Sequence, residues 1–129
     1  MSEFVLDASA VLAVLFGEPG AEMVYDAMNA SHISVINLSE VFATLLEGGM
    51  TFEDAEELVN PLPFRVRTYR EGHAWQTAKL RPLTRHLGLS LGDRACLTCA
   101  LFAHLPILTS DKRMAEANGL LDLDIRMIR

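Results

Sequence analysis

Residues 4–16 read Phe4-Val5-Leu6-Asp7-Ala8-Ser9-Ala10-Val11-Leu12-Ala13-Val14-Leu15-Phe16, and this stretch decides the fold. Three apolar residues run straight into Asp7, and a helical pattern follows at once. This order is typical of open α/β sheets, in which ligands bind beyond the carboxyl ends of the strands. The arrangement recurs near the other end of the chain as Leu105-Pro106-Ile107-Leu108-Thr109-Ser110-Asp111. We therefore predict two strands that each deliver an Asp at the carboxyl end.

The rest of the chain alternates between strand-like and helix-like patterns. Strands are predicted over residues 3–6, 33–36, 64–67, 106–109 and 124–128. Helices are predicted over residues 8–16, 21–30, 37–49, 51–59, 70–86, 93–104 and 111–118. This alternation predicts an α/β fold with a mostly parallel central sheet flanked by helices. The length of 129 residues suits one domain over residues 1–129.

Four acidic residues stand at or near predicted helix starts, and each has a purely structural explanation. They are Asp7, Glu40, Asp93 and Asp111. Asp is a preferred N-cap residue, and acids near helix N-termini gain roughly 0.3–1 kcal/mol from the helix dipole. The pairs Asn37 and Glu40, and Ser90 and Asp93, have the spacing of a capping box. Capping alone therefore accounts for any one of these acids.

Taken together, the four acids indicate a shared site. Parallel strands bring their carboxyl ends, and the helices that start there, to one edge of a sheet. Burying several unpaired carboxylates is costly, and a bound divalent cation removes that cost. A ligand set made only of oxygen suits Mg²⁺, with Mn²⁺ as a substitute. The side chains expected to orient ligands or bound waters are those of Ser9, Asn37, Thr109 and Ser110.

Charge is divided between the two halves of the chain. Residues 1–63 hold 11 Asp or Glu and no Lys or Arg, whereas residues 64–129 hold 6 Asp or Glu and all 11 Lys and Arg. The net charge of −6 argues against a nucleic-acid partner, but the basic stretch over residues 65–85 offers a surface for phosphates. No apolar run approaches the ~20 residues of a membrane span, and no basic region opens a secretory signal. We therefore expect a cytoplasmic protein without membrane contact.

Several other side chains are assigned to the core. Cys96 and Cys99 have C-x-x-C spacing, but they lie within a predicted buried helix and no second pair completes a zinc site. The four histidines are scattered and show no ligand spacing. Five apolar residues of the predicted helices are also assigned to the core, because each helix of a sandwich must bury one apolar stripe. They are Phe16, Met23, Phe42, Leu45 and Leu46, and the alternative is that they line a groove that binds a partner protein.

Four short motifs spread along the chain carry a family resemblance. They are Leu6-Asp7-Ala8-Ser9-Ala10, Asn37-Leu38-Ser39-Glu40-Val41, Leu89-Ser90-Leu91-Gly92-Asp93-Arg94-Ala95 and Leu108-Thr109-Ser110-Asp111. With these motifs in this order, the chain resembles the PIN-domain ribonucleases, and more narrowly the VapC-type toxins of bacterial and archaeal toxin–antitoxin (VapBC) pairs. One departure is Met114, where similar proteins often carry an aromatic residue.

The resemblance implies a PIN-like α/β/α sandwich and metal-dependent endonucleolytic cleavage of RNA. Asp7, Asp93 and Asp111 are expected to hold Mg²⁺, and Glu40 to bind a second ion or orient the attacking water. The resemblance also implies a homodimer and an antitoxin protein whose C-terminal segment covers the active-site groove.

RNA binding requires cations near these acids. Arg94 directly follows Asp93, and Lys112 and Arg113 directly follow Asp111. These three side chains are therefore candidates for contacting the phosphate that is cleaved or its neighbours.

Two other interpretations remain open. A receiver-type signalling domain is also a small doubly wound fold with an acidic pocket, but it requires adjacent acids after the first strand, and Ala8 follows Asp7 here. A catalytically silent member of the same fold, acting as a binding module, would bind no metal tightly and cleave nothing.

Overall fold

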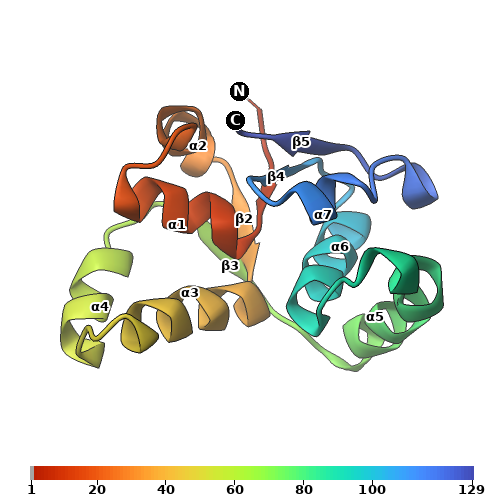
Figure 1. The fold of residues 1–129 in the computed structure, drawn as a ribbon, viewed down its shortest axis with the longest axis horizontal. Coiled ribbons are helices and arrows are strands. Elements are labelled where there is room, and N and C mark those ends of the chain that lie inside the picture. Colours follow the sequence, from red (N-terminus) through yellow and green to blue (C-terminus); the bar gives the residue numbers. More distant parts are fainter. Residues whose placement is uncertain (1) are drawn as a thin grey trace.

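A computed structural model describes residues 2–129 as one parallel sheet between two groups of helices (Figure 1). The strands are β1 (Val5–Leu6), β2 (His32–Ser34), β3 (Arg65–Arg67), β4 (Ile107–Thr109) and β5 (Ile125–Met127). The α-helices are α1 (Ala8–Phe16), α2 (Ala21–Met28), α3 (Val35–Glu47), α4 (Phe52–Val59), α5 (Glu71–Thr84), α6 (Leu91–Ala103) and α7 (Lys112–Ala115). Two short 3-10 helices, η1 (Arg85–Leu87) and η2 (Leu120–Asp122), complete the order. The predicted α/β fold with helices flanking a parallel sheet is confirmed.

The five strands lie in the order β3-β2-β1-β4-β5, and every neighbouring pair is parallel. All carboxyl ends therefore share one edge, which is the edge that carries Asp7 and Asp111. Receiver-type domains have the strand order 2-1-3-4-5 instead. The receiver interpretation is therefore wrong.

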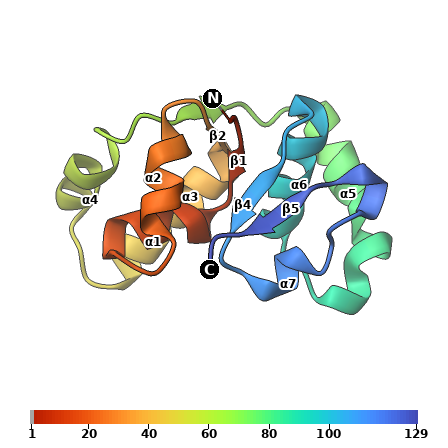
Figure 2. The same cartoon turned by 90° about the horizontal axis from the view of Figure 1, so that it is seen from above.

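The two faces of the sheet carry separate hydrophobic cores. Successive residues of a strand point to opposite faces, so Leu6 joins the core beneath α1–α4 while Val5 joins the core beneath α5–α7. Figure 2 shows the two helix groups on either side of the strands. Both cysteines are free and buried in the second core, as predicted. Met114 is fully buried there as well, so the departure from an aromatic residue keeps an apolar contact.

The start of α3 corrects one sequence-based prediction. The helix begins at Val35, because Ser34 is its N-cap and accepts a hydrogen bond from the Ile36 amide at 3.2 Å. Asn37 and Glu40 therefore do not form a capping box, and Glu40 lies in the second turn of the helix. The other predicted box is confirmed, since Ser90 and Asp93 cap α6 reciprocally.

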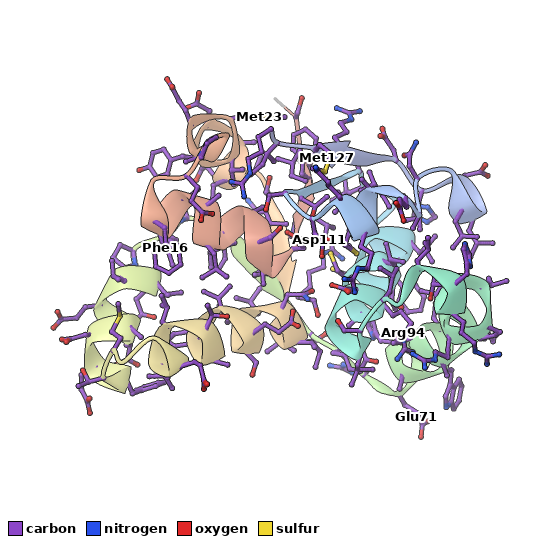
Figure 3. The ribbon with its side chains drawn as sticks, in the orientation of Figure 1. Phe16, Met23, Glu71, Arg94, Asp111 and Met127 are labelled. Carbon is purple, nitrogen blue, oxygen red and sulfur yellow. The ribbon has the colours of Figure 1, made fainter. Side chains whose placement is uncertain are left out.

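The assignment of apolar residues to the core is wrong for three of the five. Leu45 is buried and Phe42 packs at its edge, but Phe16 is 54% exposed, and Met23 and Leu46 are also exposed. Figure 3 shows Phe16 at the end of α1, near α4, and Met23 beside α2. Within residues 2–129, no helix has the length and apolarity needed to cross a membrane.

Candidate active site

Asp7 forms the centre of the carboxylate edge. It lies between β1 and α1, where it caps the helix by accepting a hydrogen bond from the Ala10 amide at 2.9 Å. The hydroxyls of Ser9 and Thr109 also donate to its two carboxylate oxygens. Burial nevertheless raises the pKa of Asp7 to about 6, because these hydrogen bonds offset the loss of water only in part. The three donors leave about one lone-pair position of the carboxylate free for another ligand.

The β4–α7 segment ties Asp111 to Asp7. The Thr109 hydroxyl donates to Asp7 and accepts from the Asp111 amide at 2.9 Å, while the Ser9 hydroxyl accepts from the Ser110 amide at 3.0 Å. The Asp111 carboxylate accepts from the Arg113 amide at 2.8 Å as the cap of α7. Its charge adds to the rise in the pKa of Asp7. Ser9 and Thr109 therefore hold the two acids in fixed relation.

Glu40 is placed by a contact between α3 and α6. The Asn37 side-chain amide donates to Glu40 Oε1 at 2.8 Å and to the Gly92 carbonyl at 3.0 Å. A methyl group at Gly92 would overlap the Glu40 carboxylate, so only glycine leaves room for it. Asn37 is buried, and its Oδ1 has no hydrogen-bond partner among residues 2–129. The pair Asn37 and Gly92 thus brings Glu40 beside the first turn of α6.

Asp93 enters the same region from the start of α6. Its carboxylate accepts from the Ser90 amide at 2.9 Å, and its own amide donates to the Ser90 hydroxyl at 3.1 Å. One turn further along α6, burial raises the pKa of the Cys96 thiol, and the charges of Asp7, Cys99, Asp93 and Glu40 raise it further. The Cys96 side chain is therefore within electrostatic reach of three of the four predicted acids.

The predicted cationic residues divide into two groups. Lys112 and Arg113 are exposed at the start of α7, directly beside Asp111. Arg94 is only partly exposed, and its guanidinium donates to the Thr77 carbonyl of α5 at 3.0 Å. Figure 3 shows Asp111 between the two helix groups and Arg94 toward α5. Arg94 thus joins α6 to α5 through its guanidinium.

The donor set fits Mg²⁺ on chemical grounds. Every candidate ligand is an oxygen, and Asp7 carries an acidic charge that burial destabilises. Across residues 2–129, no three acidic, histidine or cysteine side chains already form a preassembled cage for an ion. Mg²⁺ does not require one, because it keeps several waters and binds through one or two carboxylates.

Two residues that help to place Glu40 were not among the predicted site residues. Ser34 sets the start of α3, and a serine after a β-branched strand was a possible signal for a cap. Gly92 leaves space for Glu40, and the only signal was a glycine in the first turn of a helix, where it lowers stability.

Comparison with known proteins agrees with the fold. A sequence model described as the PIN domain matches residues 4–120. No curated protein sequence matches the chain. DNA-bound VapBC from Salmonella typhimurium has a TM-score of 0.77 at 19% identity, covering 100% of both chains. VapBC-1 from nontypeable Haemophilus influenzae has a TM-score of 0.74 at 16% identity, covering 98% of both chains.

A third similar structure is the toxin VapC20 from Mycobacterium tuberculosis, described as cleaving the sarcin–ricin loop. It has a TM-score of 0.68 at 16% identity, covering 94% of this chain and 98% of VapC20. At these identities the structural likeness establishes a shared fold, and the sequence match covers most of the chain. The chain therefore belongs to the PIN domain family.

Proposed function

We propose that this protein is a Mg²⁺-dependent endoribonuclease, with Mn²⁺ as a possible substitute, and the toxin of a toxin–antitoxin pair. The observation that carries the proposal is the Asp7 carboxyl. It is buried and accepts three hydrogen bonds, yet burial and Asp111 still raise its pKa to about 6. A buried carboxylate whose hydrogen bonds do not offset the cost of its desolvation, and which lies near other acids, is typical of a site that binds a cation.

The chain's own residues divide the work of cleavage. Asp7, Asp93 and Asp111 would hold the ion. The ion would lower the pKa of a bound water and neutralise the charge that develops on the phosphate. Asn37 occupies Glu40 Oε1, so that Oε2 remains to bind an ion or to accept a hydrogen bond from the attacking water. The other carboxylates are fixed by the helix-cap bonds described above, and little reorganisation is needed when substrate arrives.

Binding of the RNA phosphates falls to the exposed cations beside the site. Lys112 and Arg113 are the candidates, because both are exposed next to Asp111. Arg94 remains a weaker candidate, since its guanidinium is already bonded to Thr77. RNA as the substrate is supported by the resemblance to the PIN-domain ribonucleases and by the likeness to VapC20, which is described as a toxin that cleaves the sarcin–ricin loop.

The proposed partners are an antitoxin and a second copy of the chain. Several similar structures are VapBC toxin–antitoxin complexes. Apolar side chains exposed on the first helix group, among them Phe16 and Met23, offer a surface that an amphipathic antitoxin segment could cover. The acidic residues of the N-terminal half suit a basic segment. The cytoplasm is the proposed place of action, because it holds RNA and Mg²⁺.

A cleavage assay separates this proposal from a silent binding module. A fluorogenic RNA is incubated with the wild-type chain in Mg²⁺ and in EDTA, and with Asp7→Asn in Mg²⁺, while circular dichroism confirms that the variant is folded. We expect cleavage by the wild-type chain in Mg²⁺ only. Full activity of the folded variant, or cleavage in EDTA, would contradict the proposal, and a silent module cleaves in neither buffer.

A further inference from the structure

A separate groove lies beside the edge strand β3, outside the carboxylate site. It has a volume of about 510 Å³, and Arg65, Arg67, His73 and Phe102 are among the residues that line it. None of the lining residues within 2–129 is acidic. The fold does not explain why cationic and aromatic side chains gather here, because an edge strand does not need them for its stability.

The register of the sheet explains why this groove is open. Arg65 is paired with His32, and His32 with Val5, so all three side chains point to the face that α6 covers. Val5 is buried in the core beneath α6, whereas Arg65 is exposed at the sheet edge. Arg67, two residues further on, shares this face. The cationic side chains of β3 therefore lie just beyond the part of the sheet that the helix covers.

The charge of this groove is not neutralised. Neither Arg65 nor Arg67 forms an ion pair with any carboxylate in residues 2–129. The Glu3 carboxylate lies 3.3 Å from Nε2 of His32, which also lines the groove, and does not pair with either arginine. The groove is thus free to bind anions.

The rings of His73 and Phe102 also line the groove. The rings of His73 and Phe102 lie with centroids 4.6 Å apart, and the Tyr69 ring lies 5.7 Å from His73. Phe102 is 46% exposed, so much of its surface is available to a ligand. Cationic side chains beside an exposed aromatic ring are typical of surfaces that bind single-stranded nucleic acid, in which the cations contact phosphates and the bases stack on the rings.

The groove and the carboxylate site share helix α6. Phe102, which lines the groove, and Asp93 lie nine residues apart on this helix, or about 13 Å along its axis. Burial raises the pKa of Cys99, which lies between them on α6, to about 11, and the charge of Arg67 opposes that rise. A strand of RNA that passes Asp93 therefore has to extend about 13 Å along α6 to reach Phe102.

We propose that this groove binds a single-stranded segment of the RNA, with phosphates on Arg65 and Arg67 and a base against Phe102. The inference rests on the proposed function for the identity of the ligand. The charge and the exposed ring favour RNA over an acidic peptide, which would use the arginines but not the aromatic face.

Binding of a 5′-labelled single-stranded RNA, followed by fluorescence anisotropy in EDTA over a series of salt concentrations, tests the groove without cleavage. Arg65→Gln/Arg67→Gln is compared with Arg126→Gln/Arg129→Gln, which removes two exposed arginines in and just after β5, the strand at the opposite edge of the sheet. Loss of two phosphate contacts on a single strand should lower the log–log salt slope by about 1.4. We expect this change in the groove variant only. Phe102→Ala should weaken binding at least about fivefold without changing the slope.

Three results would overturn the proposal: no RNA binding by the wild-type chain, equal slope changes in the two arginine pairs, or equal binding of a polyglutamate peptide that is lost in the groove variant. A cleavage assay in Mg²⁺ keeps the two proposals separate. If the groove variants bind RNA as tightly as the wild-type chain and the wild-type chain cleaves it, the groove proposal is wrong and the nuclease proposal stands. If RNA binding depends on the groove but no cleavage occurs, the nuclease proposal is wrong and the groove proposal stands.

Discussion

Asp7, Asp93 and Asp111 each take part in a helix cap and are also the proposed ligands of the ion. A role in capping does not exclude a role in binding an ion, because a carboxylate that accepts a backbone hydrogen bond with one oxygen can still bind a further ligand. Glu40 differs, since it caps nothing and is held by Asn37. The sequence could predict the first three from local spacing, whereas the placement of Glu40 depends on a contact between distant helices.

The raised pKa of Asp7 predicts a specific pH dependence of stability. A carboxyl whose pKa is higher in the folded state stabilises that state below its unfolded pKa, near 3.8, and loses this contribution as pH rises through about 6. The loss amounts to at most about 3 kcal/mol. Without Mg²⁺, Asp7→Asn should therefore gain stability relative to the wild-type chain between pH 4 and pH 7.

Urea denaturation of both proteins at several pH values measures this difference. The quantity that matters is the change in the stability difference with pH, because the substitution also alters hydrogen bonds in a way that is nearly independent of pH. Parallel pH profiles for the two proteins would contradict the assigned pKa.

Gly92 gives a second prediction at the residue scale. Alanine in place of Gly92 would displace the Glu40 carboxylate, and misplacement of a reacting group by about 1 Å can cost 10²-fold in rate. We expect Gly92→Ala to fold and to cleave RNA roughly 10²-fold more slowly. Gly72→Ala is the matched control, since Gly72 holds the same position in α5 and a methyl group there meets nothing. Equal activity of the two variants would rule out the positioning role.

At the scale of the helices, the start of α3 shows what local patterns cannot decide. Both Ser34 and Asn37 are good cap residues, and the spacing of Asn37 to Glu40 favoured the wrong one. Ser34 is the cap because β2 ends there and passes into the helix without a loop. By contrast, the helix start at residue 51 and the capping box at Ser90 were predicted correctly, because a glycine stands two residues before each of them.

This assignment predicts opposite effects for the two residues. Ser34→Ala should lower the free energy of unfolding by about 1 kcal/mol and leave the cleavage rate nearly unchanged. Asn37→Ala should lower the cleavage rate at least about tenfold, because Glu40 loses its hydrogen bond. Denaturation and single-turnover cleavage of both variants provide the test. The reverse pattern would restore Asn37 as the cap.

At the scale of the whole molecule, the alternation of strands and helices in the sequence predicted a parallel sheet. The order of the strands within that sheet is known only from the structure. The acids come from both helix groups: Asp7 and Glu40 flank the core beneath α1–α4, while Asp93 and Asp111 flank the core beneath α5–α7. An ion bound among them would therefore connect the two halves. The sequence could not predict the groove beside β3, because its walls depend on how far α6 extends over the sheet.

Mg²⁺ should accordingly stabilise the entire fold. A ligand that binds only the folded chain adds about 2.7 kcal/mol when its concentration is 100 times its dissociation constant. We expect Mg²⁺ to raise the urea midpoint of the wild-type chain at pH 7 and to do so less at pH 5, because the ligands must be deprotonated. NaCl at matched ionic strength is the control. An equal shift in Asp111→Asn would place the ion elsewhere.

The central claim is that Asp7, Glu40, Asp93 and Asp111 act as one site. The most direct measurement is the Mg²⁺-dependent rate of RNA cleavage by the four single amide variants and by the pair Asp7→Asn/Glu40→Gln, each checked for folding. Residues that act as a unit have strongly non-additive effects. We predict that each single variant loses nearly all activity and that the pair loses little more. Losses that differ widely and multiply in the pair would contradict a shared site.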